Sequence, residues 1–153
     1  MLRAIPVRLG PRRVNQDGEF VDRPPLIDVC VSCEASWSTA TARLPQHNGI
    51  MYPALIDTGS EATAISREIA LAIGASQSSP AVLHGFSGKQ QCEAVDIHIV
   101  VPSQNLVFSS RAAVTDLSSA GHTFSIVLGR SFLQHCRFTV EGPAATYQLL
   151  WIA

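Results

Sequence analysis

The sequence predicts an all-β domain, a closed barrel-like sheet of about eight or nine short strands with one or two short helices. In the stretch 92–101, Val95, Ile97, Ile99 and Val101 face one way while Asp96 and His98 face the other, which is the period of a half-buried strand. Turn signals such as Asn48-Gly49 divide the chain into short extended runs. A length of 153 residues with 46% apolar content fits one domain with a core.

Residues 1–25 are expected to form a partly ordered N-terminal arm, and residues 26–153 the folded domain. The arm carries four prolines, and four arginines precede its first acidic residue, Asp17. It has no apolar stretch typical of a secretory signal, so the cytoplasm is the expected location.

The first half of the domain is expected to be extended apart from one helix. Residues 26–33 alternate as a strand, residues 35–43 are expected to form the second arm of a hairpin, and residues 50–56 form the next strand. Ser66 is the predicted N-cap of a helix over 67–73, which Gly74 ends.

The second half is expected to contain two hairpins and a further helix. The predicted strands are 80–86, 92–101, 106–115, 137–141 and 146–152, and the predicted helix is 131–136.

The stretch 54–61, Ala-Leu-Ile-Asp-Thr-Gly-Ser-Glu, is the most informative part of the chain. Three apolar residues lead directly to Asp57, Gly59 permits a tight bend, and the hydroxyls of Thr58 and Ser60 can bond neighbouring backbone. A carboxylate at the end of a core strand must be paired, hydrogen-bonded or functional, because burying it alone is costly. The alternative is an ordinary aspartate in a strand-to-turn transition.

This stretch resembles the active-site loop of aspartic proteases, and a second motif narrows the resemblance to the retropepsin-like family. In that family an apolar-apolar-Gly segment threads the catalytic loop and Gly-Arg-Asp/Asn opens a short helix. Residues 127–130, Val-Leu-Gly-Arg, match this pattern, with Ser131 where Asp or Asn is usual. The resemblance covers roughly residues 26–153, and it implies that Asp57, Thr58 and Gly59 are the catalytic motif.

The resemblance also implies a substrate-binding flap. Retropepsin-like proteases fold a glycine-containing hairpin over the substrate, and residues 85–88, Gly-Phe-Ser-Gly, lie at the corresponding place in the chain. A plain surface hairpin is the alternative. The expected substrate contacts are Ser60, Gly85, Phe86, Ser87, Gly88, Val127 and Leu128.

Three residues are expected to support the catalytic loop. In retropepsins an acid four residues beyond the catalytic aspartate pairs with the Arg of the second motif. The resemblance therefore implies an ion pair between Glu61 and Arg130, next to Gly129.

The mechanism that the resemblance implies needs two carboxylates that share one proton. Because the chain contains one Asp-Thr-Gly, the second aspartate is expected from another copy, in a homodimer acting on a peptide or protein substrate. The apolar segment 147–153 is expected to join an intermolecular sheet, or else to pair within its own subunit with Trp151 in the local core.

The remaining features point away from other functions. Asp28 repeats the Leu-Ile-Asp triplet but lacks a following glycine, so it is expected to be structural. Cys30 and Cys33 have the spacing of a zinc half-site without a second half, so no metal or cofactor is expected. A net charge of −1 and the absence of a long apolar run predict neither nucleic acid nor a membrane as partner. A non-catalytic dimerising or peptide-binding module of the same fold is the main alternative to a protease.

Overall fold

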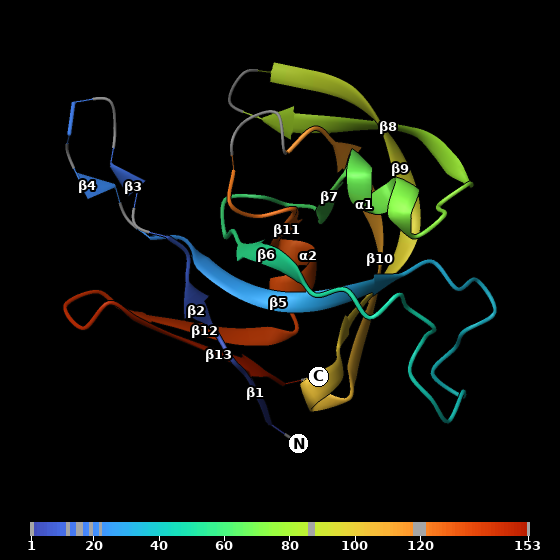
Figure 1. The fold of residues 1–153 in the computed structure, drawn as a ribbon, viewed down its shortest axis with the longest axis horizontal. Coiled ribbons are helices and arrows are strands. Elements are labelled where there is room, and N and C mark those ends of the chain that lie inside the picture. The colour runs from blue at the N-terminus through green and yellow to red at the C-terminus, as the bar shows by residue number, and fades with distance from the viewer. Residues whose placement is uncertain are drawn as a thin grey trace.

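The computed structural model describes residues 2–11, 13–14, 17–18, 20–21, 23–85, 88–117 and 122–152. Within them, strands dominate, and the α-helices are two short ones, as the sequence predicts (Figure 1). The strands of the first half are β1 (Arg3–Ile5), β2 (Arg8–Leu9), β3 (Arg13–Val14), β4 (Phe20–Val21), β5 (Pro25–Ser32), β6 (Tyr52–Ile56) and β7 (Ala64–Ser66). Those of the second half are β8 (Ser78–Gly85), β9 (Gly88–Val101), β10 (Leu106–Thr115), β11 (Ile126–Leu128), β12 (Cys136–Glu141) and β13 (Thr146–Trp151).

Six strands form a closed ring, which confirms the barrel-like prediction. The hydrogen-bonded order is β5-β6-β11-β7-β10-β9, and pairing of β5 with β9 closes it, while β2 and β8 extend the sheet beyond the ring. Two contacts in the ring are parallel, β6 with β11 and β7 with β10. The apolar faces of these strands point inward because side chains alternate along each strand. The core includes Ile27, Val29, Ile65, Ile97, Ile99, Ile126 and Leu128.

The two helices are short and lie at strand ends. Helix α1 (Arg67–Ala72) begins at the predicted cap, where the hydroxyl of Ser66 accepts from the amide of Ile69, and Gly74 follows with a φ of +70°. Helix α2 (Arg130–Leu133) begins earlier than predicted, because Gly129 rather than Ser131 is its N-cap. A 3-10 turn, η1 (Pro102–Gln104), separates β9 from β10.

The segment between β5 and β6 is not the second arm of a hairpin, as the sequence predicted for residues 35–43. It forms turns and bends instead. The guanidinium of Arg43 pairs with the Glu34 carboxylate, and the Trp37 indole donates to the Arg43 carbonyl at 2.8 Å. The indole bond gives the Arg43 carbonyl a side-chain donor in place of the backbone partner that a strand would have supplied.

A second, three-stranded sheet has the order β1-β13-β12. The last strand is therefore central, with β1 on one side and β12 on the other, and it has no free edge for a second copy of the chain. Leu149 is fully buried and Trp151 is 9% exposed. Of the two possibilities for the terminal segment, pairing within the subunit is the one observed.

Part of the segment expected to form an arm belongs to these sheets. Ile5 in β1 is 3% exposed and joins the core, and β2 pairs with the start of β5. The Arg8 guanidinium binds the Asp28 carboxylate through two bonds of 2.8 and 2.7 Å. Asp28 therefore has a structural partner, as the sequence predicted.

Candidate active site

Strands β6 and β11 place the Asp-Thr-Gly loop. They run parallel, with Ile56 in register with Leu128, and both residues are buried in the core. The amide of Asp57 continues this pairing by donating to the Leu128 carbonyl at 3.1 Å. Because two core strands fix the backbone up to Asp57, its carboxylate emerges at a defined position.

The loop holds the Asp57 carboxylate through its own backbone. The amide of Gly59 donates to Asp57 Oδ1 at 2.8 Å, and the amide of Ser60 donates to the Asp57 carbonyl at 3.3 Å. Asp57 is half-buried, whereas Thr58 and Gly59 are exposed. The hydroxyl of Ser60 donates to the Ala62 carbonyl at 3.0 Å, which turns the chain back towards β7.

Gly129 and Arg130, which belong to the second motif, pack closely against this loop and hydrogen-bond to it. A side chain at Gly129 would lie 2.7 Å from the Ser60 carbonyl oxygen, so only glycine fits this close approach. The Arg130 amide donates to the same oxygen at 2.8 Å. Its guanidinium donates to the carbonyls of Thr58 and Gly59 at 3.1 and 3.2 Å. The two motifs predicted from the sequence therefore meet in space.

The predicted ion pair between Glu61 and Arg130 is not formed among the described residues, which contain three other ion pairs. The backbone of Glu61 accepts from the Ser131 amide at 2.9 Å, while its side chain is exposed. Arg130 instead satisfies loop carbonyls that have no strand partner. The guanidinium is therefore committed to the loop backbone rather than to the Glu61 carboxylate.

A cleft of about 520 Å³ opens beside Asp57. It lies between the Asp-Thr-Gly loop, the β8–β9 hairpin and the end of β10. Its lining comprises Asp57, Ser60, Ala62, Ala64, Leu83, His84, Gly88, Gln90, Thr115, Asp116, Leu117 and Val127. A second cleft of the same volume shares Ser60, Ala62, Leu83 and His84 with the first and extends to Glu61 and Arg111.

The predicted substrate contacts are only partly brought together. Ser60, Gly88 and Val127 line the first cleft. Leu128 does not, because it is fully buried in the core, and a side chain without exposed surface cannot touch a substrate. Contact of the predicted residues with a substrate stays a prediction.

The predicted flap is the hairpin of β8 and β9. Gly85 and Gly88 form its last pair, and Gly88 has a φ of +105°. Phe86 and Ser87, which were also expected to touch substrate, lie outside the described residues.

Sequence reasoning missed two groups of cleft residues. Leu83 and His84 lie in β8 just before the predicted flap, Thr115 is the last residue of β10, and Leu117 follows two positions later. No motif in the sequence marks these residues. They reach the cleft only because strand pairing brings them there.

Comparison with known proteins gave matches among solved structures. No protein-family model matches the chain, and no curated protein is significantly similar to it in sequence. Three similar solved structures are retropepsin-type proteases. EIAV protease complexed with the inhibitor HBY-793 is 16% identical, with 72% of this chain and 86% of that chain covered and a TM-score of 0.47. A retropepsin-like aspartic protease from Rickettsia conorii is 16% identical, covering 95% and 94%, with a TM-score of 0.45. The retroviral protease-like domain of Ddi1 from Leishmania major is 10% identical, covering 80% and 83%, with a TM-score of 0.40.

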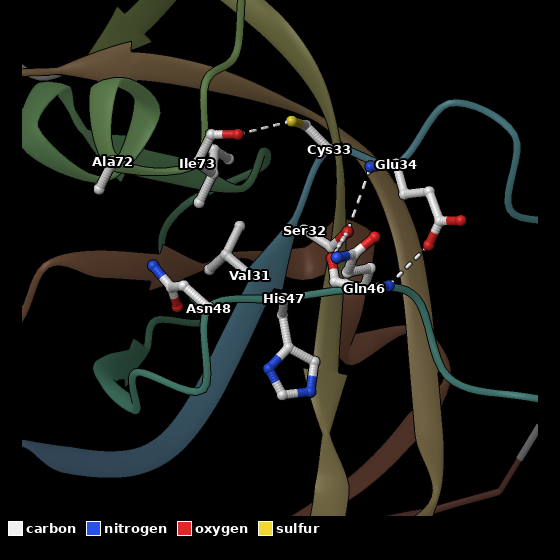
Figure 2. Close-up of a pocket in the computed structure, with 9 residues that line it drawn as sticks. All are labelled: Val31, Ser32, Cys33, Glu34, Gln46, His47, Asn48, Ala72 and Ile73. Carbon is white, nitrogen blue, oxygen red and sulfur yellow. Dashed lines mark hydrogen bonds between the residues drawn. The ribbon is translucent and has the colours of Figure 1, made fainter.

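A separate pocket of about 410 Å³ lies next to Cys33, and no residue of the Asp-Thr-Gly motif lines it. Figure 2 shows the Cys33 thiol pointing to the Ile73 carbonyl, to which it donates at 2.9 Å, while the His47 ring points away from it. Among the described residues, no group of three or more His, Cys, Asp or Glu side chains is placed to hold a metal ion.

All four cysteines are free. Burial raises the pKa of the Cys30 thiol, and it raises that of Cys136 to about 12.

In the part of the chain that the structure describes, neither helix is long and apolar enough to cross a membrane.

Proposed function

We propose that this chain is an aspartic endopeptidase that works as a homodimer, with Asp57 of each copy forming the catalytic pair. The observation that carries the proposal is the setting of Asp57. Its carboxylate ends a core strand, is held by the Gly59 amide at 2.8 Å, and faces a cleft that the β8–β9 hairpin also lines. The motifs Asp57-Thr58-Gly59 and Val127-Leu128-Gly129-Arg130 resemble those of retropepsin-like proteases and pack against each other.

Two facing carboxylates supply the chemistry. Like charges about 3 Å apart cannot both ionise, so the pair retains one proton. The ionised member accepts a proton from a water molecule, which attacks the carbonyl carbon of the peptide bond. The protonated member donates a hydrogen bond to the carbonyl oxygen as charge develops there. Collapse of the tetrahedral intermediate breaks the carbon–nitrogen bond, and the amine leaves with a proton.

The loop geometry keeps the first member in place. The amide of Gly59 is a donor to the Asp57 carboxylate, and Arg130 holds the carbonyls of Thr58 and Gly59 from the other side. A carboxylate fixed in this way needs little reorganisation when it takes a proton, which is the benefit of preorganised catalytic groups. A metal or organic cofactor has no step in this mechanism.

The cleft suits an extended peptide. Leu83, Leu117 and Val127 supply apolar surface beside Asp57, and Gly88 and Gln90 of the β8–β9 hairpin also line the cleft. A hairpin in this position can close over a bound chain and exclude water from the reacting bond.

The test is peptide hydrolysis by the purified chain and two matched variants. Wild type and Asp57→Asn are incubated with a peptide library, with and without pepstatin, and products are identified by mass spectrometry. Asp28→Asn is the control, since Asp28 follows the same Leu-Ile pair but is paired with Arg8. We expect Asp57→Asn to lower the rate by about 10²–10⁴-fold or more and Asp28→Asn to leave it unchanged.

Two outcomes would contradict the proposal. Cleavage by Asp57→Asn at the wild-type rate would remove Asp57 from the mechanism. An inert wild-type chain that binds peptides in the same library would favour the non-catalytic module.

A further inference from the structure

The Asn48-Gly49 turn before β6 carries chemical groups that the proposed protease mechanism does not use. Of the asparagines in the sequence, only Asn48 is followed by glycine. Both residues are exposed, and Gly49 has a φ of +76°. An asparagine side chain next to glycine is open to attack by the glycine nitrogen, because no Cβ shields that nitrogen. The product of this attack is a cyclic imide, and ammonia is released.

A proton acceptor already lies on the attacking nitrogen. The Gly49 amide donates to Nδ1 of His47 at 3.1 Å. A ring nitrogen that accepts a hydrogen bond carries no proton of its own, so Nδ1 is the basic atom of this imidazole. A basic atom within hydrogen-bond reach of a proton that must leave is the arrangement of a general base. His47 therefore stands where it takes the Gly49 proton as the nitrogen attacks.

The side-chain amide under attack is held by two further contacts. The backbone amide of Ile50 donates to Asn48 Oδ1 at 3.0 Å. Negative charge develops on this oxygen when its carbon becomes tetrahedral, and a fixed N–H donor stabilises that charge. The leaving nitrogen, Asn48 Nδ2, donates to the Tyr52 hydroxyl at 3.3 Å. In the tetrahedral state this nitrogen gains a lone pair, so the phenol can turn its own proton towards it.

One of these contacts also belongs to an ordinary Asx turn. An asparagine oxygen that accepts from the amide two residues on is common in turns, and it needs no further role. The turn does not require a basic acceptor on the Gly49 amide or a hydroxyl at Asn48 Nδ2. Together the contacts place a base, a donor to the developing oxyanion and an acid on the atoms that change during cyclisation.

We propose that Asn48 undergoes intramolecular deamidation in the folded chain, with His47 as general base. The bond from the Gly49 nitrogen to Asn48 Cγ forms as the Gly49 proton passes to His47 Nδ1. The bond from Cγ to Nδ2 then breaks, and ammonia leaves with a proton from Tyr52 or water, while the proton on His47 returns to solvent. Water opens the imide at either carbonyl, which leaves aspartate or isoaspartate at position 48.

The modification alters the segment that leads into β6. Asn48 lines the pocket beside Cys33, so the product adds a negative charge to the lining of that pocket (Figure 2). The new carboxylate also lacks the amide hydrogen that Tyr52, the first residue of β6, accepts. Isoaspartate in addition lengthens the backbone by a methylene before the strand that ends next to Asp57.

The rate of amide loss in the folded chain tests the proposal. The purified chain is incubated near neutral pH and digested, and mass spectrometry follows the peptide that contains Asn48, with aspartate and isoaspartate separated by chromatography. Asn105, which precedes Leu106, is the internal reference, and the chain in denaturant gives the rate without the fold. We expect Asn48 to lose its amide at least about tenfold faster in the folded chain than in denaturant, and Asn105 to stay intact. A faster rate in denaturant would show that the fold protects Asn48, which overturns the proposal.

Substitution of the base separates the chemistry from the structure of the turn. His47→Asn keeps a side-chain oxygen near the place of Nδ1, so it accepts the Gly49 hydrogen bond but takes no proton. His122→Gln is the matched control, because His122 is an exposed histidine outside this turn. We expect His47→Asn to slow amide loss at Asn48 by about tenfold or more, and the control to keep the wild-type rate. Equal rates in wild type and His47→Asn would remove His47 from the reaction and overturn the proposal.

Discussion

Gly129 packs against the loop that carries Asp57, so close to Ala62 that a Cβ at Gly129 would stand 2.5 Å from the Ala62 carbonyl oxygen. The φ of Gly129 is −85°, so the requirement for glycine is one of space rather than of backbone conformation. The neighbouring Arg130 amide donates to Ser60 at this point, so any shift of Gly129 also moves the loop that carries Asp57.

Gly129→Ala should therefore damage both stability and activity. Overpacking against a fixed backbone costs about 1–3 kcal/mol, and the displaced loop should lower kcat/KM. Gly142→Ala is the control, because nothing lies within 4 Å of a Cβ at Gly142. Thermal unfolding and peptide cleavage measured on both variants check this, and equal effects of the two substitutions would contradict it.

Arg130 and Glu61 should act independently. Arg130→Gln removes two hydrogen bonds to loop carbonyls, which are worth about 0.5–1.5 kcal/mol each, and should reduce activity by disordering the loop. Glu61→Gln should change stability by less than about 0.5 kcal/mol, since its side chain is exposed. A double-mutant cycle should give a coupling energy near zero, whereas a coupling above about 1 kcal/mol would restore the ion pair that the motif implied.

The sequence predicted the elements that local chemistry decides. Ser66 and Gly74 bracket α1 because a cap and a left-handed residue act over one helical turn. The alternation from Val95 to Val101 marks β9, and the four side chains on its apolar face (Val95, Ile97, Ile99 and Val101) are all buried. The meeting of the Asp57 loop with Gly129 followed from the two motifs together.

The features that the sequence did not predict depend on which segments meet in space. Arg130 was matched to the wrong partner because the acceptors it uses are backbone carbonyls, which have no side-chain signature. Val127 and Leu128 are neighbours in β11 and point to opposite faces, so Val127 lines the cleft whereas Leu128 is buried in the core. The central place of β13 depends on β1, more than 140 positions earlier in the 153-residue chain.

The Arg8–Asp28 pair should give a small stability change in acid. The bond from Arg8 lowers the pKa of Asp28 below its ordinary value. The pair therefore stabilises the fold at pH values above the unfolded pKa near 4, and this contribution is lost as pH falls through the lower folded pKa. Both side chains are at least 40% exposed, so the contribution should be about 0–1 kcal/mol. Denaturant unfolding of wild type and Asp28→Asn should differ at pH 6 and converge near pH 2; a difference that grows in acid would contradict the pairing.

The Cys136 thiol should resist alkylation in the folded protein. Burial raises its pKa to about 12, so at pH 8 its thiolate fraction should be about a thousandfold lower than that of an ordinary thiol. Iodoacetamide labelling followed by mass spectrometry of peptides should find Cys136 unmodified under native conditions and labelled in denaturant. Equal labelling rates in both conditions would show that the thiol is exposed.

Trp151 should be essential for folding, because it joins the last strand to the core. Its ring lies 5.4 Å from Phe132 and 6.2 Å from Phe108, centroid to centroid, and stacks on His135 at 5.3 Å. Trp151→Ala should cost about 3–5 kcal/mol through lost contacts and a cavity. Ile152→Ala is the control at the next position, since Ile152 is 49% exposed and should change stability by less than about 0.5 kcal/mol.

Removal of residues 149–153 should likewise unfold the chain, since it deletes half of the central strand of the β1-β13-β12 sheet. Circular dichroism and thermal unfolding check both changes, and a truncated chain that keeps a cooperative transition at the wild-type temperature would show that β13 is dispensable.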